Sequence, residues 1–419
     1  MEKMSDAIFH EAQEYYQKVT SLYAQNKYEQ SYELGNIWLR NNNTEISEIV
    51  KSSKNAIDAI HKIQDTWLYS VNVSDKVKEN AVDWLLDNQK RSGFDLFKTA
   101  AKFQESKYSN PDNNVVRNNR ILTPDFLRIT SYLNQMKRFC KMPKSKFAAL
   151  ELGAGCGHLA RVMKLAYSHC SYVIIDIPET LIFSYMFLRL NFPKAKTLYV
   201  ACEEDIDSQY LNDFDFVFVP TMFAEKILNI KYHLFINTAS MGEMNNKIIR
   251  YWMGYVQNKL KVDYLFTFNR YLNSILVDGS MDWRLNENEC SVHYDSNWDI
   301  LNWELEPSYS QCPFVDTIIT RNVEIVAQKT PPLTLKQKKS KSKRLYLDVM
   351  DEDWVRISKS FSAIMTKGDN LLNNDLSMSG TLFKLWDSIR YEPNENNVAL
   401  ILRYLARLLN RWDIEFEEV

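Results

Sequence analysis

The chain has 419 residues, which is long enough for two or three domains and for a sizeable buried core. Its 51 Lys and Arg residues nearly balance its 53 Asp and Glu residues, which argues against nucleic acid or anionic lipid as a partner. A chain with a net charge near zero can still carry a local basic patch. The six cysteines form neither a CxxC pair nor a zinc-finger spacing. They favour a reducing cytosol over a disulfide scaffold, and we expect no metal site.

The N-terminal residues, MEKMSDAIFHEAQEYY, have mixed charge and a helix-like pattern, unlike a signal peptide. The most apolar stretch, Thr180 to Phe192, contains Arg189 and is far shorter than the roughly 20 residues that span a bilayer. We therefore expect a soluble, cytoplasmic protein with no membrane partner.

Residues 1–115 are expected to form a helical N-terminal region. Between residues 46 and 67, apolar side chains recur at steps of three and four, as they do on one face of a helix. These side chains are Ile46, Ile49, Val50, Ile57, Ile60, Ile63 and Trp67. The Asn-rich stretch from Ser106 to Arg120 contains Pro111 and is interpreted as a loop or linker.

Between residues 116 and 330, short apolar runs alternate with helical patterns, which is typical of βαβ units around a parallel sheet. The candidate strands are 147–152, 172–176, 214–219, 233–237, 264–268, and 317–319 with 324–327. The helical pattern from Glu243 to Leu260 predicts one buried face, made of Ile248, Ile249, Trp252, Tyr255 and Val256.

The last part of the chain begins with a double proline and a basic Ser and Lys run, so residues 331–345 are interpreted as an exposed basic linker rather than a nucleic-acid arm. Residues 346–419 return to helical patterns, with one apolar stripe from Val398 to Trp412. This stripe is expected to pack on the central domain, across a homodimer or on a partner protein.

Three glycines, Gly153, Gly155 and Gly157, follow the apolar run that ends at Leu152. A glycine turn between a strand and a helix lets the backbone approach a ligand closely. A dinucleotide fingerprint would need a third glycine at His158. The observed spacing, with Glu151 two residues before the first glycine, suits S-adenosylmethionine, which has no pyrophosphate and offers an ammonium group and ribose hydroxyls. A tight turn without a ligand is the simpler alternative.

A second acid, Asp176, closes the next apolar run, 23 residues after Gly153. An acid at this position can accept hydrogen bonds from both ribose hydroxyls, as it does in dinucleotide-binding sheets. Asp176, Pro178 and Glu179 also match the start of a helix. We favour ribose binding because the glycine loop precedes this acid, and the two roles are compatible.

A third apolar run ends at Asn237 and Thr238, and open α/β sheets bind ligands at such carboxyl ends. Asn237 is expected to meet the methionine end of the cofactor or the substrate. Ser240 and Glu243 match the capping box S-x-x-E, which favours Glu243 as a helix cap over a general base.

Methyl transfer depends mainly on positioning, and a poorly acidic hydroxyl also needs a general base. The candidate bases are His158, His233, His293 and Glu243. His158 follows the glycine loop, whereas His233 begins a strand and is interpreted as structural. His293 lies in a segment rich in polar and aromatic residues, which suits a sugar ring, although packing explains aromatics equally well. The sequence does not choose among these residues.

Four segments together resemble the bacterial sugar O-methyltransferase family, a branch of the class I S-adenosylmethionine-dependent methyltransferases associated with surface-polysaccharide and glycan gene sets. They read ALELGAGCGHLARVMK, YVIIDIPETLIFSYMFLRLNFP, FINTASMGEMNNKIIRYW and FTFNRY. The runs DIPET and NTASMGEM are more specific than the glycine loop, and the likeness covers roughly residues 115–330. The family's loop often has an aromatic residue and a further glycine where this chain has Cys156 and His158.

The resemblance implies an α/β fold, a Rossmann-like seven-stranded class I methyltransferase sheet, here with helical N-terminal and C-terminal regions. Only one strand is needed between Asp176 and Asn237, and residues 214–219 fit it best, with residues 197–201 as an added edge strand or a surface excursion. The expected cofactor-binding residues are Glu151, Gly153, Ala154, Gly155, Gly157, Asp176, Ile177, Thr221, Met222, Asn237 and Thr238, with Thr221 and Met222 near the adenine.

The leading expectation is S-adenosylmethionine-dependent methylation of a hydroxyl on a sugar, a glycan or another small molecule. One alternative is a natural-product O- or N-methyltransferase. Another is a catalytically inactive methyltransferase-like protein that binds partners through its helical flanks. The glycine loop and Asp176 favour cofactor binding over loss of it.

Overall fold

The computed structural model describes residues 2–24, 46, 48–67, 74–91, 93–99, 103–206, 213–241, 244, 246–270, 275–277, 280–282, 298–305 and 322–329. The expected linker 331–345, the expected helical region 346–419 and the expected strand 317–319 lie outside these residues.

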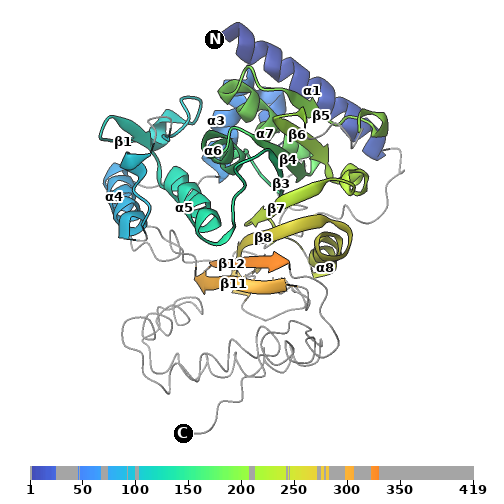
Figure 1. Ribbon diagram of the computed structural model, residues 1–419. Helices are drawn as coiled ribbons and strands as arrows, with labels where there is room; N and C mark the ends of the chain where they lie inside the picture. The colour runs from blue at the N-terminus through green and yellow to red at the C-terminus, as the bar shows by residue number, and fades with distance from the viewer. Residues whose placement is uncertain are drawn as a thin grey trace, which may run out of the picture.

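An eight-stranded sheet forms the centre of the molecule, in the order β5-β6-β4-β3-β7-β8-β12-β11, which runs from top to bottom in Figure 1. The six parallel strands are β5 (Thr197–Tyr199), β6 (Phe216–Pro220), β4 (Cys170–Asp176), β3 (Phe147–Leu152), β7 (Lys231–Thr238) and β8 (Lys261–Arg270). At the lower edge, β12 (Asn322–Lys329) runs antiparallel to both β8 and β11 (Trp298–Leu305). The predicted α/β class is therefore confirmed.

The sheet has eight strands rather than the expected seven, because β5 pairs with the outer side of β6. The strand β6 pairs with β4, as predicted for residues 214–219, and residues 197–199 supply the added edge strand. In contrast, β11 was not predicted, since Asp299, Asn302 and Glu304 interrupt its apolar residues.

The central strands are buried along their whole length because helices cover both faces of the sheet. Every residue of β3, β4 and β6 is buried. Strands enclosed in this way are continuous apolar runs rather than alternating ones, which is why the sequence pattern located them. The predicted bounds of β3 match the structure at both ends.

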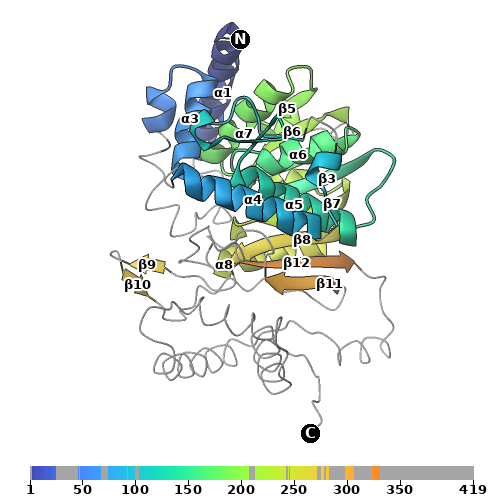
Figure 2. The ribbon, with the colours of Figure 1, turned by 90° about the vertical axis from the view of Figure 1, so that its left-hand side faces the viewer.

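The helix α7 (Pro178–Asn191) is apolar on all sides, and 11 of its 14 residues are buried. One side packs on β4 and β6, while α1 (Glu2–Ala24) and α3 (Ala56–Trp67) cover the other side. Figure 2 shows these N-terminal helices lying over α7, beside the upper edge of the sheet. The N-terminal region therefore forms an outer layer on the sheet domain.

Two further helices extend this layer towards the end of β3. The helix α4 (Asp75–Arg91) packs on α5 (Pro124–Phe139), and α5 packs on α6 (His158–Ala166), which follows the glycine loop. In Figure 1, α4 and α5 lie to the left of the sheet and α8 (Asn246–Gly254) lies to its right. The sheet is thus enclosed between helices on its two faces.

The predicted face of the helix Glu243–Leu260 is confirmed by the burial of Ile248, Ile249, Trp252, Tyr255 and Val256. The helix itself begins at Asn246 and ends in a π-helical turn at Tyr255–Lys259.

The other short elements of the described residues are two hairpins and four 3₁₀ turns. The hairpins are β1 (Val115–Arg117) with β2 (Arg120–Leu122) and β9 (Ile275–Val277) with β10 (Ser280–Asp282). The 3₁₀ turns are Leu96–Lys98, Pro111–Asn113, Glu203–Asp205 and η6 (Thr221–Ile227).

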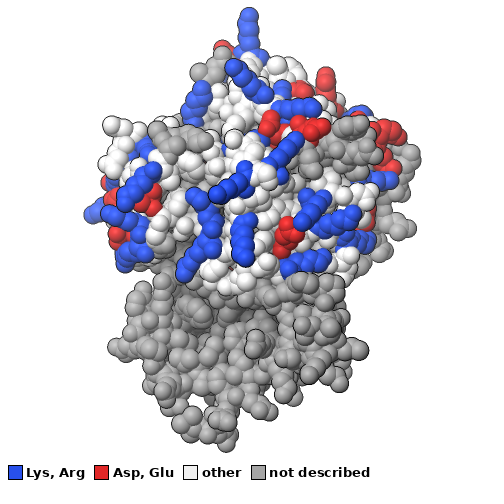
Figure 3. Space-filling view, in the orientation of Figure 1, with Lys and Arg blue, Asp and Glu red and all other residues white. Residues whose placement is uncertain are grey.

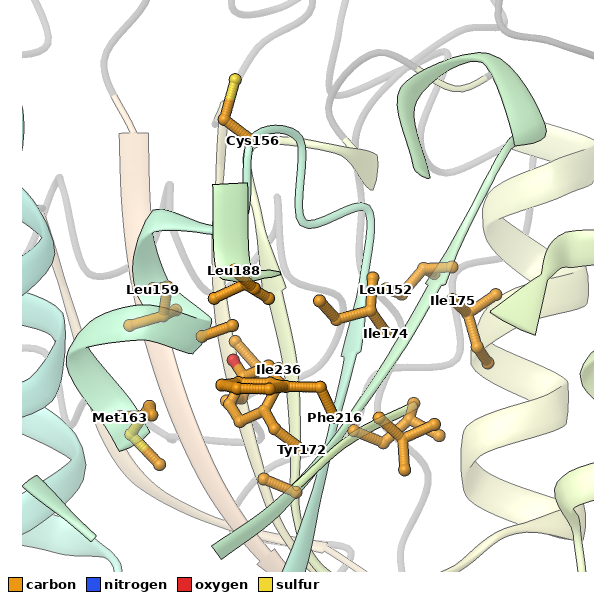
Figure 4. Close-up of a cluster of buried hydrophobic side chains, with 14 of the residues drawn as sticks. Leu152, Cys156, Leu159, Met163, Tyr172, Ile174, Ile175, Leu188, Phe216 and Ile236 are labelled. Atoms are coloured by element: carbon orange, nitrogen blue, oxygen red, sulfur yellow. The ribbon is translucent and has the colours of Figure 1, made fainter. Parts of the chain in front are cut away.

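Buried apolar side chains form one cluster that extends from Ile8 to Ala327. Figure 4 shows its centre, where Leu159 and Met163 of α6 and Leu188 of α7 meet side chains of the sheet. The cluster crosses residue 115 without a break, since it includes both the N-terminal helices and the strands.

The Asn-rich stretch 106–120 is partly buried against the domain and includes a 3₁₀ turn and strand β1. Glu105 is 3% exposed and accepts hydrogen bonds from Ser109 Oγ at 3.0 Å and Thr123 Oγ1 at 2.8 Å. Arg161 of α6 donates to the Gln104 carbonyl at 2.9 Å. Since Thr123 caps α5, this loop ties the starts of α5 and α6 together.

Lys and Arg side chains gather on the face that Figure 3 shows, although the whole chain has a net charge of −2. Along the chain, lysines stand just before or at the start of parallel strands: Lys141, Lys144, Lys146, Lys194, Lys196, Lys231 and Lys261. A neutral total therefore hides an uneven distribution of charge. Within the described ranges, no helix is long and apolar enough to cross a membrane.

Candidate functional site

The glycine loop between β3 and α6 has a backbone conformation that residues other than glycine adopt only with strain. Gly153, Gly155 and Gly157 have φ angles of +73°, +55° and +80°. A Cβ atom on Gly153 would lie 2.0 Å from Ser240 Oγ, so the loop after β7 packs directly on this glycine. The concentration of glycines after β3 is thus required by both the backbone conformation and the close approach of another loop.

Asp176 fixes this loop from the end of β4. Its Oδ2 accepts a hydrogen bond from the Gly155 amide at 3.2 Å, and its Oδ1 accepts one from the Ile177 amide at 2.8 Å. The residue is 7% exposed, and burial raises its pKa to about 6 despite these bonds. The N-cap of α7 is Ile177, so Asp176 stands one residue before the cap.

Glu151 is a buried acid at the carboxyl end of β3. Its Oε2 accepts a hydrogen bond from Tyr172 Oη at 2.9 Å, and its Oε1 accepts one from Thr238 Oγ1 at 3.4 Å. The side chain is 1% exposed, and this burial raises the pKa of Glu151 to about 8, with a smaller contribution from the charge of Asp176. The carboxyl group is therefore mostly protonated at neutral pH until a cation approaches it.

Asn237 lies at the same edge of the sheet but holds protein groups instead of facing the cavity. Its Nδ2 donates to the Leu152 carbonyl at 2.8 Å. Its Oδ1 accepts from the Met241 amide at 3.1 Å and from Asn269 Nδ2 at 2.9 Å. Asn237 therefore joins the ends of β3, β7 and β8, a structural role that explains its complete burial.

A cavity of about 160 Å³ opens at the carboxyl ends of β3 and β7. These two strands are neighbours in the sheet. After β3, however, the chain first forms β4 and β6 on one side of β3 and only then returns to form β7 on the other side. The cavity therefore lies at the switch point of the strand order, where open α/β sheets bind ligands. Its wall consists of Arg128, Ile129, Tyr132, Glu151, Gly153, Ala154, Gly155, Cys156, His158, Leu159, Thr238, Ala239 and Phe268. Since small-molecule sites hold roughly 300–1,000 Å³, this cavity fits one end of an extended ligand.

The cavity wall contains six of the residues expected from the sequence: Glu151, Gly153, Ala154, Gly155, Thr238 and His158. The helix α5 supplies three residues that sequence reasoning missed, namely Arg128, Ile129 and Tyr132. No motif marks them, because they come from a helix that precedes the glycine loop. The one available signal was that Arg128 and the aromatic Tyr132 are four residues apart, a spacing that places both on one face of a helix.

The other expected residues lie away from the cavity wall or outside the described chain. Gly157, Asp176, Ile177, Thr221, Met222 and Asn237 are not among the lining residues. Thr221 begins η6, and its buried Oγ1 has no hydrogen-bond partner within the described residues. The candidate bases Glu243 and His293 lie outside the described residues.

Two more candidates are placed by their neighbours. His233 lies near the start of β7, at the opposite end of the strand from the cavity, with Nδ1 3.4 Å from Asp263 Oδ2. Its predicted structural role fits this position. Cys156 belongs to the core cluster, lies above the other labelled side chains in Figure 4 and also lines the cavity, and burial raises the pKa of its thiol, which keeps it neutral. Across the described part of the chain, no group of His, Cys, Asp and Glu side chains could hold a metal ion.

No protein-family model matches the chain, and no curated protein matches it. Among solved structures, it is similar to TrmK from M. capricolum in complex with S-adenosyl-homocysteine, with 13% identity, a TM-score of 0.29, and coverage of 66% of this chain and 97% of that chain. It is also similar to the CurJ carbon methyltransferase, with 15% identity, a TM-score of 0.31, and coverage of 49% of this chain and 55% of that chain.

A third similar structure is the O-methyltransferase family 2 protein from Planctomyces limnophilus in complex with apigenin, with 11% identity, a TM-score of 0.29, and coverage of 49% of this chain and 57% of that chain. Likenesses with TM-scores this low carry no argument about chemistry.

Proposed function

We propose that the protein is an S-adenosylmethionine-dependent methyltransferase that acts on a hydroxyl of a small molecule. The observation that carries this proposal is the pairing of the glycine loop with the buried acid Glu151 in one cavity wall. The ammonium and sulfonium groups of S-adenosylmethionine would stabilise the ionised form of this carboxyl group, whereas a pyrophosphate would oppose its ionisation and gain no such attraction. The same wall therefore favours this methyl donor over a dinucleotide.

The residues of the cavity fit the amino-acid end of this cofactor. Glu151 is placed to accept a hydrogen bond from the ammonium group, and Arg128, on the facing helix α5, is placed to hold the carboxylate. Asp176 anchors Gly155 at the end of β4 and remains our candidate for the ribose hydroxyls. Thr221, whose buried Oγ1 needs a partner, and Met222 remain candidates for the adenine end.

When bound, the cofactor would supply a methyl group on a sulfonium for in-line displacement. The chain's own part is to orient the two reactants and to exclude water, which accounts for most of the catalysis in such a reaction. For a poorly acidic hydroxyl, Glu243 and His293 remain the proposed bases. A sugar or glycan acceptor remains the proposal on the strength of the sequence resemblance, since the rings of Tyr132 and Phe268 in the cavity wall are buried and pack on each other.

The cofactor is tested by titrating the purified protein with S-adenosyl-homocysteine in a calorimeter. We expect micromolar binding, and Gly153→Ala should abolish it, since the new Cβ atom would collide with Ser240. The matched control is Gly93→Ala, which has a similar φ of +91° but no atom within 4 Å of the added carbon. Absence of binding by the folded wild-type protein would contradict the proposed cofactor.

The acceptor class is tested separately, with labelled methyl donor and a panel of glycans, nucleotide sugars, phenolic compounds and amines. Transfer to a sugar hydroxyl would support the proposal, while transfer to phenols or amines would identify the natural-product alternative. Tight cofactor binding without transfer to any of these acceptors, to protein or to RNA would favour an inactive interaction protein.

A further inference from the structure

A hydrogen bond connects the N-terminal region to the cavity wall. Gln64 of α3 and His158 of α6 approach with their Nε2 atoms 3.1 Å apart. Gln64 is completely buried, and His158 both begins α6 and lines the cavity. This contact joins residues 94 positions apart in the sequence.

The direction of this hydrogen bond follows from the other end of the Gln64 amide. Gln64 Oε1 accepts a hydrogen bond from the Asn110 backbone amide at 2.8 Å. A backbone amide only donates, so Oε1 must face Asn110 and the NH₂ group must face His158. An NH₂ group only donates as well, so His158 Nε2 must accept. His158 is therefore neutral and carries its proton on Nδ1.

The surroundings of the ring keep it neutral. Its centroid lies 4.5 Å from that of Phe187 of α7, and burial lowers the pKa of His158. Glu105 and Asp125 act in the opposite direction, while Arg161 and Arg128 add to the lowering. The neutral ring agrees with the hydrogen-bond direction, which was obtained from geometry alone.

Gln64 is itself held from two sides. The loop residue Asn110 donates from its backbone to Gln64 and from its side chain to Asp65 of the same helix. This loop also carries Glu105, which binds the cap of α5 through Thr123 Oγ1. The loop therefore fixes α3, α5 and α6 relative to one another, and α5 and α6 form two sides of the cavity.

We propose that Gln64 is a positioning residue for the cofactor cavity and that it fixes His158 as the Nδ1–H tautomer. In this arrangement His158 is a fixed, neutral part of the cavity wall and not a general base, because its only lone pair is engaged by Gln64. The N-terminal region thereby belongs to the working site. The proposal rests on the proposed function only in taking S-adenosyl-homocysteine as the ligand.

The first test is the tautomer of His158, which needs no ligand. In nitrogen NMR spectra of the wild-type protein we expect the Nδ1–H form to persist across pH 6–8. Gln64→Glu replaces the donor by an acceptor, so the proton should move to Nε2 and the ring should titrate at a higher pH. A wild-type ring with its proton on Nε2, or one that titrates near its ordinary pKa, would overturn the proposal.

The second test is the affinity for S-adenosyl-homocysteine. Gln64→Met keeps the length of the side chain but removes its hydrogen bonds to both His158 and Asn110, and we expect it to weaken binding by about tenfold. The matched control is Gln89→Met, which likewise removes buried hydrogen bonds of a Gln amide, to the Leu127 carbonyl and to Thr130 Oγ1, between α4 and α5. Both variants should lower the melting temperature, but only Gln64→Met should weaken binding. Equal weakening by both would overturn the positioning role.

The third test separates positioning from base catalysis. His158→Gln places an amide oxygen near the position of Nε2, where it can still accept from Gln64, whereas His158→Ala cannot. We expect His158→Gln to weaken S-adenosyl-homocysteine binding less than His158→Ala does, because only the Gln side chain can still accept a hydrogen bond from Gln64. In both variants kcat should fall no further than the affinity does. A loss of kcat by more than about 100-fold with unchanged binding would make His158 the base. If wild-type protein fails to bind the ligand, the proposed function fails while the tautomer test still decides the role of Gln64.

Discussion

The buried carboxyl group of Glu151 makes protein stability and ligand affinity respond to pH in opposite ways. Burial raises the folded-state pKa of Glu151 to about 8 from an ordinary value of 4.5. The folded protein therefore holds a proton that the unfolded chain releases above pH 4.5. This contribution to the unfolding free energy is fully present below about pH 4.5 and is lost as pH rises to about 8.

We expect Glu151→Gln to stabilise the ligand-free protein relative to wild type as pH rises from 5 to 9, by an amount on the order of a few kcal/mol. The amide is neutral at every pH and can still accept the hydrogen bond from Tyr172. Urea unfolding at several pH values measures this difference. A difference that does not change with pH would show that Glu151 is ionised in the folded protein.

The same variant should lose affinity for S-adenosyl-homocysteine, because the ligand's ammonium group would no longer meet a carboxylate. Binding to the wild-type protein near pH 7 should release close to one proton, since the ammonium group lowers the pKa of Glu151. Calorimetric titrations in buffers with different ionisation enthalpies measure this release. Glu151→Gln should show none, and equal release by both proteins would place the titrating group elsewhere.

Arg128 gives a prediction that distinguishes the two ends of the ligand. Its side chain is 25% exposed, lies 3.2 Å from Asp125 Oδ1 and lines the cavity. We expect Arg128→Gln to weaken S-adenosyl-homocysteine binding roughly 10- to 100-fold, since it removes a charge-assisted hydrogen bond to the carboxylate. Binding of 5′-methylthioadenosine, which lacks the amino-acid end, should stay within about threefold of wild type. Equal losses for both ligands would mean that Arg128 maintains the shape of the cavity.

At the level of single residues, the sequence predicted the positions that a motif marks and missed those that only packing determines. The glycine loop, and Glu151 beside it, were recognisable because the positive φ angles of this loop favour glycine at fixed positions after the strand. Asn237 was correctly located at a strand end. Its side-chain amide, however, forms hydrogen bonds with three protein groups, which the spacing of residues in the sequence does not reveal. Arg128 reaches the cavity because α5 packs on α6, beside the glycine loop.

At the level of elements, the apolar runs predicted the central strands because these are buried on both faces. The edge strands were harder: β5 has three residues, and β11 alternates with polar residues. The partners of α7 were not predictable either. Its apolar residues occupy every side, so the sequence indicates burial but does not name the covering elements.

The covering of α7 by α3 gives a prediction about stability. Ile60 lies on α3, is completely buried and belongs to the cluster that includes α7. We expect Ile60→Ala to lower the unfolding free energy by about 2–5 kcal/mol, as for other buried aliphatic truncations. The control is Val116→Ala, since Val116 is 60% exposed and should change stability by less than about 0.5 kcal/mol. A small effect at Ile60 would mean that α3 is only loosely attached.

At the level of the whole molecule, the N-terminal helices and the sheet share one hydrophobic cluster and one set of buried polar bonds. A region attached in this way should not open independently, because its separation would expose α7 and leave the Gln64 amide without partners. We therefore expect the amides of α1 and α3 to exchange hydrogen with the same opening free energy as those of β4, in native-state exchange at increasing denaturant. S-adenosyl-homocysteine should slow both sets equally, since it stabilises a single folded unit. Faster exchange of α1 and α3, unchanged by the ligand, would show that the N-terminal region is a separate unit and would remove the physical basis for its contribution to the cavity.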